Sequence, residues 1–100
     1  MDPANPDINI SDVVVSTAGR DQGEWFYVIA EDSHFLYLAN GKDRALDKPK
    51  RKKRKHVQKV LRSETRVADK LRLGDKVLNS ELRRDLAYLS QNTQSNATGG

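Results

Sequence analysis

Short apolar runs separated by turn residues occupy the first 40 positions of the chain. Residues 12–17 are rich in valine, and residues 24–31 and 34–39 combine aromatic with aliphatic side chains, a composition typical of strands. The two later runs are apolar at both odd and even positions. In a small β scaffold one set fills the interior, so we expect helices further along the chain to cover part of the other set.

Turn residues separate these runs. Residues 18–23 contain two glycines four positions apart, and residues 32–33 (Asp-Ser) form a tight connection. Residues 40–41 are Asn-Gly, the strongest short hairpin signal in the chain, since both residues tolerate positive φ. We therefore expect a return strand within residues 42–46 and another near residues 54–61.

Beyond residue 61 the apolar positions recur every three or four residues, which indicates helices. Ser63 is a candidate N-cap for a first helix, and Gly74 is its expected terminator. A second helix is expected to begin at Asn79 or Ser80. Its apolar stripe consists of Leu82, Leu86 and Leu89.

Polar segments frame these elements. Residues 1–10 carry two prolines and two aspartates, and residues 91–100 are polar and end in glycine, so both are predicted to be disordered. Between them we expect a β domain at residues 11–61 and a helical extension at residues 62–90. The predicted fold is mainly β, followed by one or two short C-terminal α-helices.

The charge of the chain is unevenly distributed. The formal net charge is +4 in 100 residues, of which 36% are hydrophobic, enough for one small domain. Residues 42–62 hold 11 basic and 2 acidic residues, whereas the remainder holds 7 basic and 12 acidic residues. An acidic body with one concentrated cationic segment points to directed contact with a polyanion.

The cationic segment centres on residues 48–55, called the basic strip below, in which seven of eight residues are lysine or arginine. The strip supplies no carboxylate, so we expect it to lie on the surface, facing water or a polyanion. The eighth residue, Pro49, confines it to a loop or a sheet edge. Extended, it spans roughly 26 Å, which suits a nucleic-acid backbone. With about five phosphates engaged, log K falls against log salt with a slope of roughly −3.5 to −4.5.

The sequence lacks the residues that several kinds of catalytic and metal-binding site require. The chain has no cysteine, which excludes disulfides, zinc ribbons and thiol catalysis. His34 and His56 have no partner at metal-ligand spacing, and there is no nucleophile elbow or carboxylate cluster. We therefore expect no enzymatic activity, no metal, no cofactor and no small-molecule substrate.

Membrane insertion and secretion are not expected either. No apolar run approaches the about 20 residues that span a bilayer. The first seven residues are acidic and lack an apolar core, unlike a signal peptide. We expect a soluble, cytoplasmic protein.

The valine run, the Gly19-Arg20-Asp21-x-Gly23 turn, the Asn-Gly pair and the Lys-Pro-Lys sequence together resemble the KOW module. More narrowly, residues 11–57 are similar to small bacterial KOW-domain RNA-binding proteins, which resemble a group of archaeal and eukaryotic large-subunit ribosomal proteins. One departure is Glu24, because many KOW modules carry lysine after the second glycine. Residues 62–100 fall outside the resemblance.

The resemblance implies an SH3-like β barrel at residues 11–61 that binds RNA, typically ribosomal RNA, without catalysis. Ribosomal RNA and possible neighbouring ribosomal proteins are the implied partners. By position, the two loop glycines would be the turn glycines of the motif and Arg20 its exposed cation. The complete set of RNA-binding candidates is Gly19, Arg20, Gly23, Lys42, Arg44, Lys48, Lys50, Arg51, Lys52, Lys53, Arg54, Lys55 and His56.

Other interpretations of the same features stay open. The strip satisfies the composition of a nuclear import signal, or a solvated linker. The whole chain also fits a protein-interaction adaptor, in which the leucine stripe docks a protein and the strip binds an acidic partner. Four aromatic side chains offer stacking faces to unpaired bases, but their place within strands favours packing in the core: Trp25, Tyr27, Phe35 and Tyr37.

Overall fold

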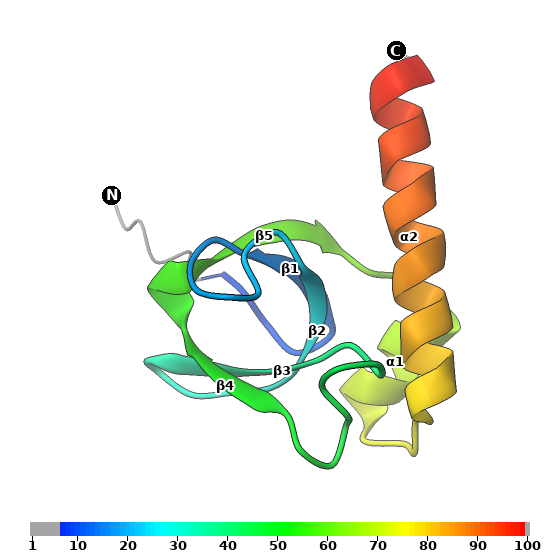
Figure 1. Cartoon of the computed structure of the whole chain (residues 1–100). Helices are drawn as coiled ribbons and strands as arrows, with labels where there is room; N and C mark the ends of the chain where they lie inside the picture. The colour runs from blue at the N-terminus through cyan, green and yellow to red at the C-terminus, as the bar shows by residue number, and fades with distance from the viewer. Residues whose placement is uncertain (1–6, 100) are drawn as a thin grey trace.

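The computed structural model describes residues 7–99 as a five-stranded sheet with two helices (Figure 1). The strands are β1 (Asp12–Ser16), β2 (Trp25–Glu31), β3 (Phe35–Ala39), β4 (Lys50–Lys53) and β5 (Val57–Arg62). A 3-10 helix, η1 (Arg54–His56), stands between β4 and β5, and the helices are α1 (Arg66–Leu73) and α2 (Asn79–Gly99). The predicted mainly β fold with helices at the C-terminal end is confirmed, but α2, with 21 residues, is longer than the short helix that was expected.

The sheet is antiparallel throughout, in the order β4-β3-β2-β1-β5. Its two edge strands, β4 and β5, are consecutive in the chain and are joined only by the three residues of η1. So short a connection requires the sheet to curl until its edges approach each other. Irregular register between Val13 and Val14, and between Val28 and Ala30, accompanies this bending. Figure 1 shows that the five strands curve into a ring around the interior of the domain.

Alternation along the strands divides the apolar residues between two cores. The inner core, enclosed by the curled sheet, contains Ile8, Val14, Phe26, Val28, Leu36, Leu38 and Val57. The outer core lies between the sheet and the helices, and contains Val13, Tyr27, Ala39, Val67, Ala68, Leu82 and Leu86. The expectation that helices cover the second face of the strands is therefore confirmed.

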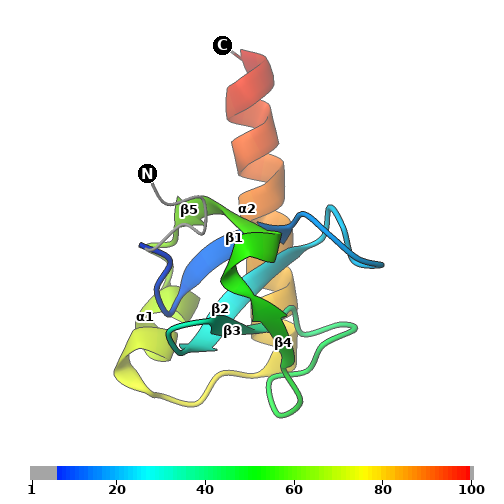
Figure 2. The ribbon, with the colours of Figure 1, turned by 90° about the vertical axis from the view of Figure 1, so that its left-hand side faces the viewer.

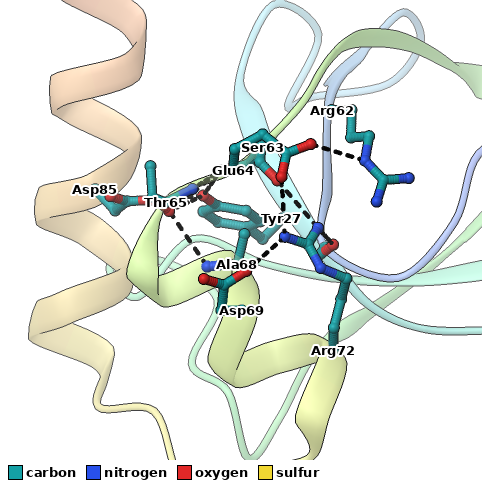
Figure 3. A network of polar contacts seen from close by, with 10 residues as sticks. Tyr27, Arg62, Ser63, Glu64, Thr65, Ala68, Asp69, Arg72 and Asp85 are labelled. Atoms are coloured by element: carbon teal, nitrogen blue, oxygen red, sulfur yellow. Dashed lines mark hydrogen bonds and ion pairs between the residues drawn. The ribbon is translucent and has the colours of Figure 1, made fainter.

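A polar network fastens this outer layer (Figure 3). The Tyr27 hydroxyl donates to the Asp85 carboxylate of α2 and lies 2.7 Å from the Ser63 hydroxyl. Thr65 donates to the same carboxylate at 2.8 Å. Burial, and then the Asp85 carboxylate, raise the pKa of Tyr27, so its hydroxyl keeps its proton. One tyrosine thus links the sheet to both helices.

The caps of α1 match the expectation at one end only. Thr65, not Ser63, is the N-cap, and its side chain accepts from the Ala68 amide at 3.2 Å. Ser63 is unsuited to that task because its hydroxyl is buried against Tyr27. Gly74 ends the helix in the left-handed conformation, as predicted.

The predicted return strand at residues 42–46 is wrong. The side chain of Asn40 accepts from the amides of Lys42 and Arg44, both at 2.9 Å, and the Leu46 amide donates to the Asn79 side chain. These bonds fold the segment into a loop against the start of α2. The strand that follows the Asn-Gly turn begins only at residue 50.

The ends of the ordered domain also differ from the expectation. Residues 1–6 lie outside the described part of the chain, but disorder is wrong for residues 7–10, because Ile8 is fully buried in the inner core. Disorder from residue 91 is wrong as far as Gly99, since the backbone of α2 continues to that residue. The chain has no proline or glycine between Asn79 and Gly99 that would stop a helix.

The second half of α2 extends away from the sheet, as Figures 1 and 2 show from two directions. This half of the helix is polar in sequence. Within the described residues, no helix combines the length and the apolar character that crossing a bilayer requires.

We expect Gly41→Ala to destabilise the fold more than Gly23→Ala. Both glycines have positive φ, 76° and 91°, but an added Cβ at Gly41 would stand 2.2 Å from the Asn79 carbonyl oxygen, whereas the space at Gly23 is open. Conformational strain alone costs about 1–2 kcal/mol, and the clash raises the expected loss at Gly41 to about 3 kcal/mol. Urea unfolding of both variants checks this, and equal losses would contradict the packing of the loop on α2.

Candidate nucleic-acid interface

The basic strip occupies one edge of the sheet. Within residues 7–99, β4 pairs only with β3, and Pro49 stands immediately before it. The proline predicted a loop or a sheet edge, and the structure confirms an edge. The rest of the strip continues into η1, which leads to the opposite edge. In Figure 2 β4 lies at the front of the molecule, away from α2.

Side chains alternate along β4, and the strip therefore has two faces. Lys52 is buried, with 8% of its surface exposed, and its ammonium group lies 2.6 Å from Asp21 Oδ1 and 2.7 Å from the Ala18 carbonyl oxygen. The Lys50 ammonium lies 2.8 Å from Asp21 Oδ2. The expectation that the whole strip faces solvent without carboxylate partners is wrong, because a distant loop supplies the carboxylate.

Asp21 belongs to the Gly19–Gly23 turn and holds that turn against β4. Its carboxylate is buried and also accepts from the Ser16 hydroxyl at 2.7 Å. Burial by itself raises the pKa of this carboxyl, but the hydrogen bonds from Lys50, Lys52 and Ser16 outweigh it, so the pKa lies well below its ordinary value of 3.8. Asp21 is therefore ionised and paired, and the turn is fixed in place.

Arg54, at the start of η1, is the third cation of the basic strip that forms bonds within the protein. Its guanidinium lies 2.5 Å from a Glu31 carboxylate oxygen and donates to the carbonyl oxygens of Asp32 and Ile8, at 3.0 and 3.2 Å. These bonds tie η1 to the end of β2 and to the N-terminal segment. Arg54 is thus placed to hold the fold together, as well as to add positive charge.

The other half of the strip faces outward. Arg51 and Lys53 alternate with the two inward lysines, and Lys48 and Lys55 flank the strand. All four are exposed and form no ion pair with an acidic residue of the described chain. The Arg51 guanidinium lies over the Phe35 ring, 4.4 Å from its centroid. His56 is half-buried beside them. These outward cations are the part of the strip that phosphates can reach.

The remaining predicted cations lie around the first end of β4. All three, Arg20, Lys42 and Arg44, are exposed. A surface hollow is lined by residues of the Gly19–Gly23 turn and of the loop between β3 and β4. Cations and carboxylates share its lining, which consists of Arg20, Asp21, Glu24, Phe26, Asp43, Arg44 and Lys50. Because Glu24 and Asp43 offset the positive charge here, the hollow is a weaker candidate for binding phosphate than the outward face of β4.

Sequence reasoning missed two features of this interface. One is Asp21 as the internal partner of the strip, since Lys50 lies 29 positions further along the chain. The other is the only partly buried position of Phe35 beside the outward cations. A signal for the first was present, because alternate lysines on a strand must face opposite directions. No protein-family model and no curated protein matches this chain.

We expect Asp21→Asn to destabilise the protein by about 3 kcal/mol at neutral pH, because it leaves Lys52 buried without a counter-ion. The folded-state pKa lies below the unfolded one, so this stabilisation is complete above pH 3.8 and is lost as pH falls through the lower folded-state value. The difference in stability between the two proteins should therefore narrow progressively as pH falls below 3.8. Urea unfolding between pH 7 and pH 2 measures this.

The matched control is Glu64→Gln, which makes the same chemical change in the exposed pair with Arg62. Little change is expected, since exposed ion pairs contribute little. An Asp21→Asn variant as stable as the Glu64→Gln variant would contradict the assigned role of Asp21.

Proposed function

We propose that this protein is a non-catalytic RNA-binding module that contacts the phosphates of structured RNA. The observation that carries the proposal is the outward face of β4 and its flanks, where four exposed cations stand without an acidic partner in the described chain. A cationic ribbon on an otherwise acidic body favours a polyanion. The KOW resemblance favours RNA, and ribosomal RNA in particular, among polyanions.

The arrangement of the sheet supports the narrower part of the proposal, an SH3-like barrel. Its edge strands are consecutive and a 3-10 helix of three residues joins them. The curled sheet encloses an apolar core, as a small barrel does. The KOW resemblance, which covers residues 11–57, implies the same barrel.

The expected energetics are electrostatic. Lysine and arginine displace condensed counterions from phosphates, a gain that depends on salt and carries little base information. Because the protein itself engages three of the seven strip cations, we count about four phosphate contacts. The expected slope of log K against log salt is then about −2.8 for single strands and about −3.6 for a duplex.

A protein-interaction adaptor remains the second candidate, although its proposed docking stripe is not available. Leu82 and Leu86 are buried against the protein's own sheet. Exposed apolar side chains do occur elsewhere on the helical layer: Leu73, Leu78 and Tyr88 are 75%, 52% and 58% exposed. If the protein recovers the same protein partners after its outward cations are replaced by neutral residues, that result would favour this candidate.

The double variant Lys53→Gln/Lys55→Gln is expected to weaken RNA binding and to lower the salt slope by about 1.4 to 1.8, because two phosphate contacts are lost. Both side chains are exposed, so the stability of the fold should not change. Filter binding or fluorescence anisotropy across a salt series measures the slope. The matched control is Lys76→Gln, an exposed lysine between the helices, which should bind RNA as the unmodified protein does.

Ultraviolet crosslinking followed by sequencing identifies the RNA. The wild-type protein is expected to recover defined RNA species, and the double variant much less of the same species. Failure to recover RNA above background, or binding that is indifferent to salt, would refute the proposed function.

A further inference from the structure

Two aromatic and two cationic side chains share one face at the β4 edge. In the register of the pairing, Phe35 stands opposite Lys53 and Tyr37 stands opposite Arg51. Directly opposite residues lie on the same face of a sheet, so the four form a square in which Arg51 reaches diagonally over the Phe35 ring. We call this set, Phe35, Tyr37, Arg51 and Lys53, the aromatic–cation patch.

The patch lies on the outer face of the sheet, but outside the area that the helices cover. Along β3, Ala39 is buried in the outer core beneath the helices, whereas Phe35 and Tyr37, on the same face, are half-buried and do not belong to that core. On the neighbouring strand the residue opposite Tyr37 is Ala30, which is exposed and too small to cover a ring. The helical layer thus ends before the patch.

Phe35 lies between two hollows of the surface. One is lined by His34, Phe35, Lys53 and Lys55. The other is lined by Phe35, Lys50, Arg51, Lys52, Lys53 and His56. Flat, apolar surface is therefore bordered on both sides by groups that can carry positive charge. The Tyr37 hydroxyl donates to Asp32 at 3.3 Å, which orients that ring within the patch.

We propose that the aromatic–cation patch stacks an unpaired RNA base, while Lys53 and Lys55 bind the phosphates on either side of it. The proposal rests on the RNA-binding function proposed above. Unpaired bases stack on aromatic rings and on arginine guanidinium planes, and Phe35 with Arg51 offers both. The bases of a duplex are stacked on each other and cannot reach such a surface. The protein therefore prefers RNA with an unpaired loop or bulge to a plain duplex.

Two RNA probes of equal phosphate number test the preference: a hairpin with 2-aminopurine in its loop, and a blunt duplex. The wild-type protein is expected to bind the hairpin more tightly and to quench the 2-aminopurine fluorescence. Phe35→Leu, which keeps an apolar side chain but removes the ring, should lower the hairpin affinity by about 5-fold to 100-fold. Its duplex affinity should stay unchanged, because phosphate contacts remain.

Two further variants separate stacking from folding. Phe35→Tyr keeps the ring and should retain the hairpin preference. Arg51→Lys keeps the charge of an exposed side chain but removes the guanidinium plane, so it should reduce quenching and weaken hairpin binding more than duplex binding. Arg51→Lys also decides the question if Phe35→Leu does not fold, which thermal unfolding would reveal.

The outcomes distinguish this inference from the proposed function. If Phe35→Leu and Arg51→Lys bind and quench the hairpin as the wild type does, or weaken both RNAs equally, the stacking site is refuted and RNA binding stands. If the wild type binds neither RNA in a salt-dependent manner, the proposed function itself fails.

Discussion

The two-residue alternation of side chains along a β-strand is the constraint on which this structure depends. It assigns Val13 and Val14, adjacent in sequence, to different cores, and it does the same to Phe26 and Tyr27. The sheet can satisfy both sets only by curling around one core and receiving helices over the other. The architecture of the whole chain follows from strands that are apolar on both faces.

The same alternation acts on charge in β4. Strand geometry turns Lys50 and Lys52 inward, where burial reduces the hydration of their ammonium groups, and Asp21 is the carboxylate that makes this arrangement stable. The ion pairs also close the glycine turn onto the edge strand. The consecutive cations of β4 thus form two faces. The inward lysines pair with Asp21 of the same chain, and the outward side chains are exposed, where a polyanion can reach them.

The helices limit the surface that is proposed to bind RNA, as well as completing the fold. Tyr27 and Asp85 fasten α2 over one end of the outer face, and the opposite end of that face is left open beside the basic edge (Figures 1 and 3). Edge strands normally carry charge that prevents pairing with other sheets. Here the charged edge adjoins the half-buried rings of Phe35 and Tyr37, so the surface proposed to bind RNA combines exposed cations with a flat aromatic face.

Local features of this chain could be read from its residues. Valine and aromatic runs predicted three strands to within a residue or so, Pro49 restricted the basic strip to a loop or a sheet edge, and Gly74 marked the end of α1. These signals are local, because each depends on backbone preferences of a few residues. Tertiary structure alone decided that Asp21 meets Lys50 and Lys52, that the Ser63 hydroxyl bonds Tyr27 and does not cap α1, and that Ile8 enters the core. Each of these contacts joins residues that are far apart in the sequence and that folding brings together. The residues next to them in the sequence do not indicate which distant residues they will contact.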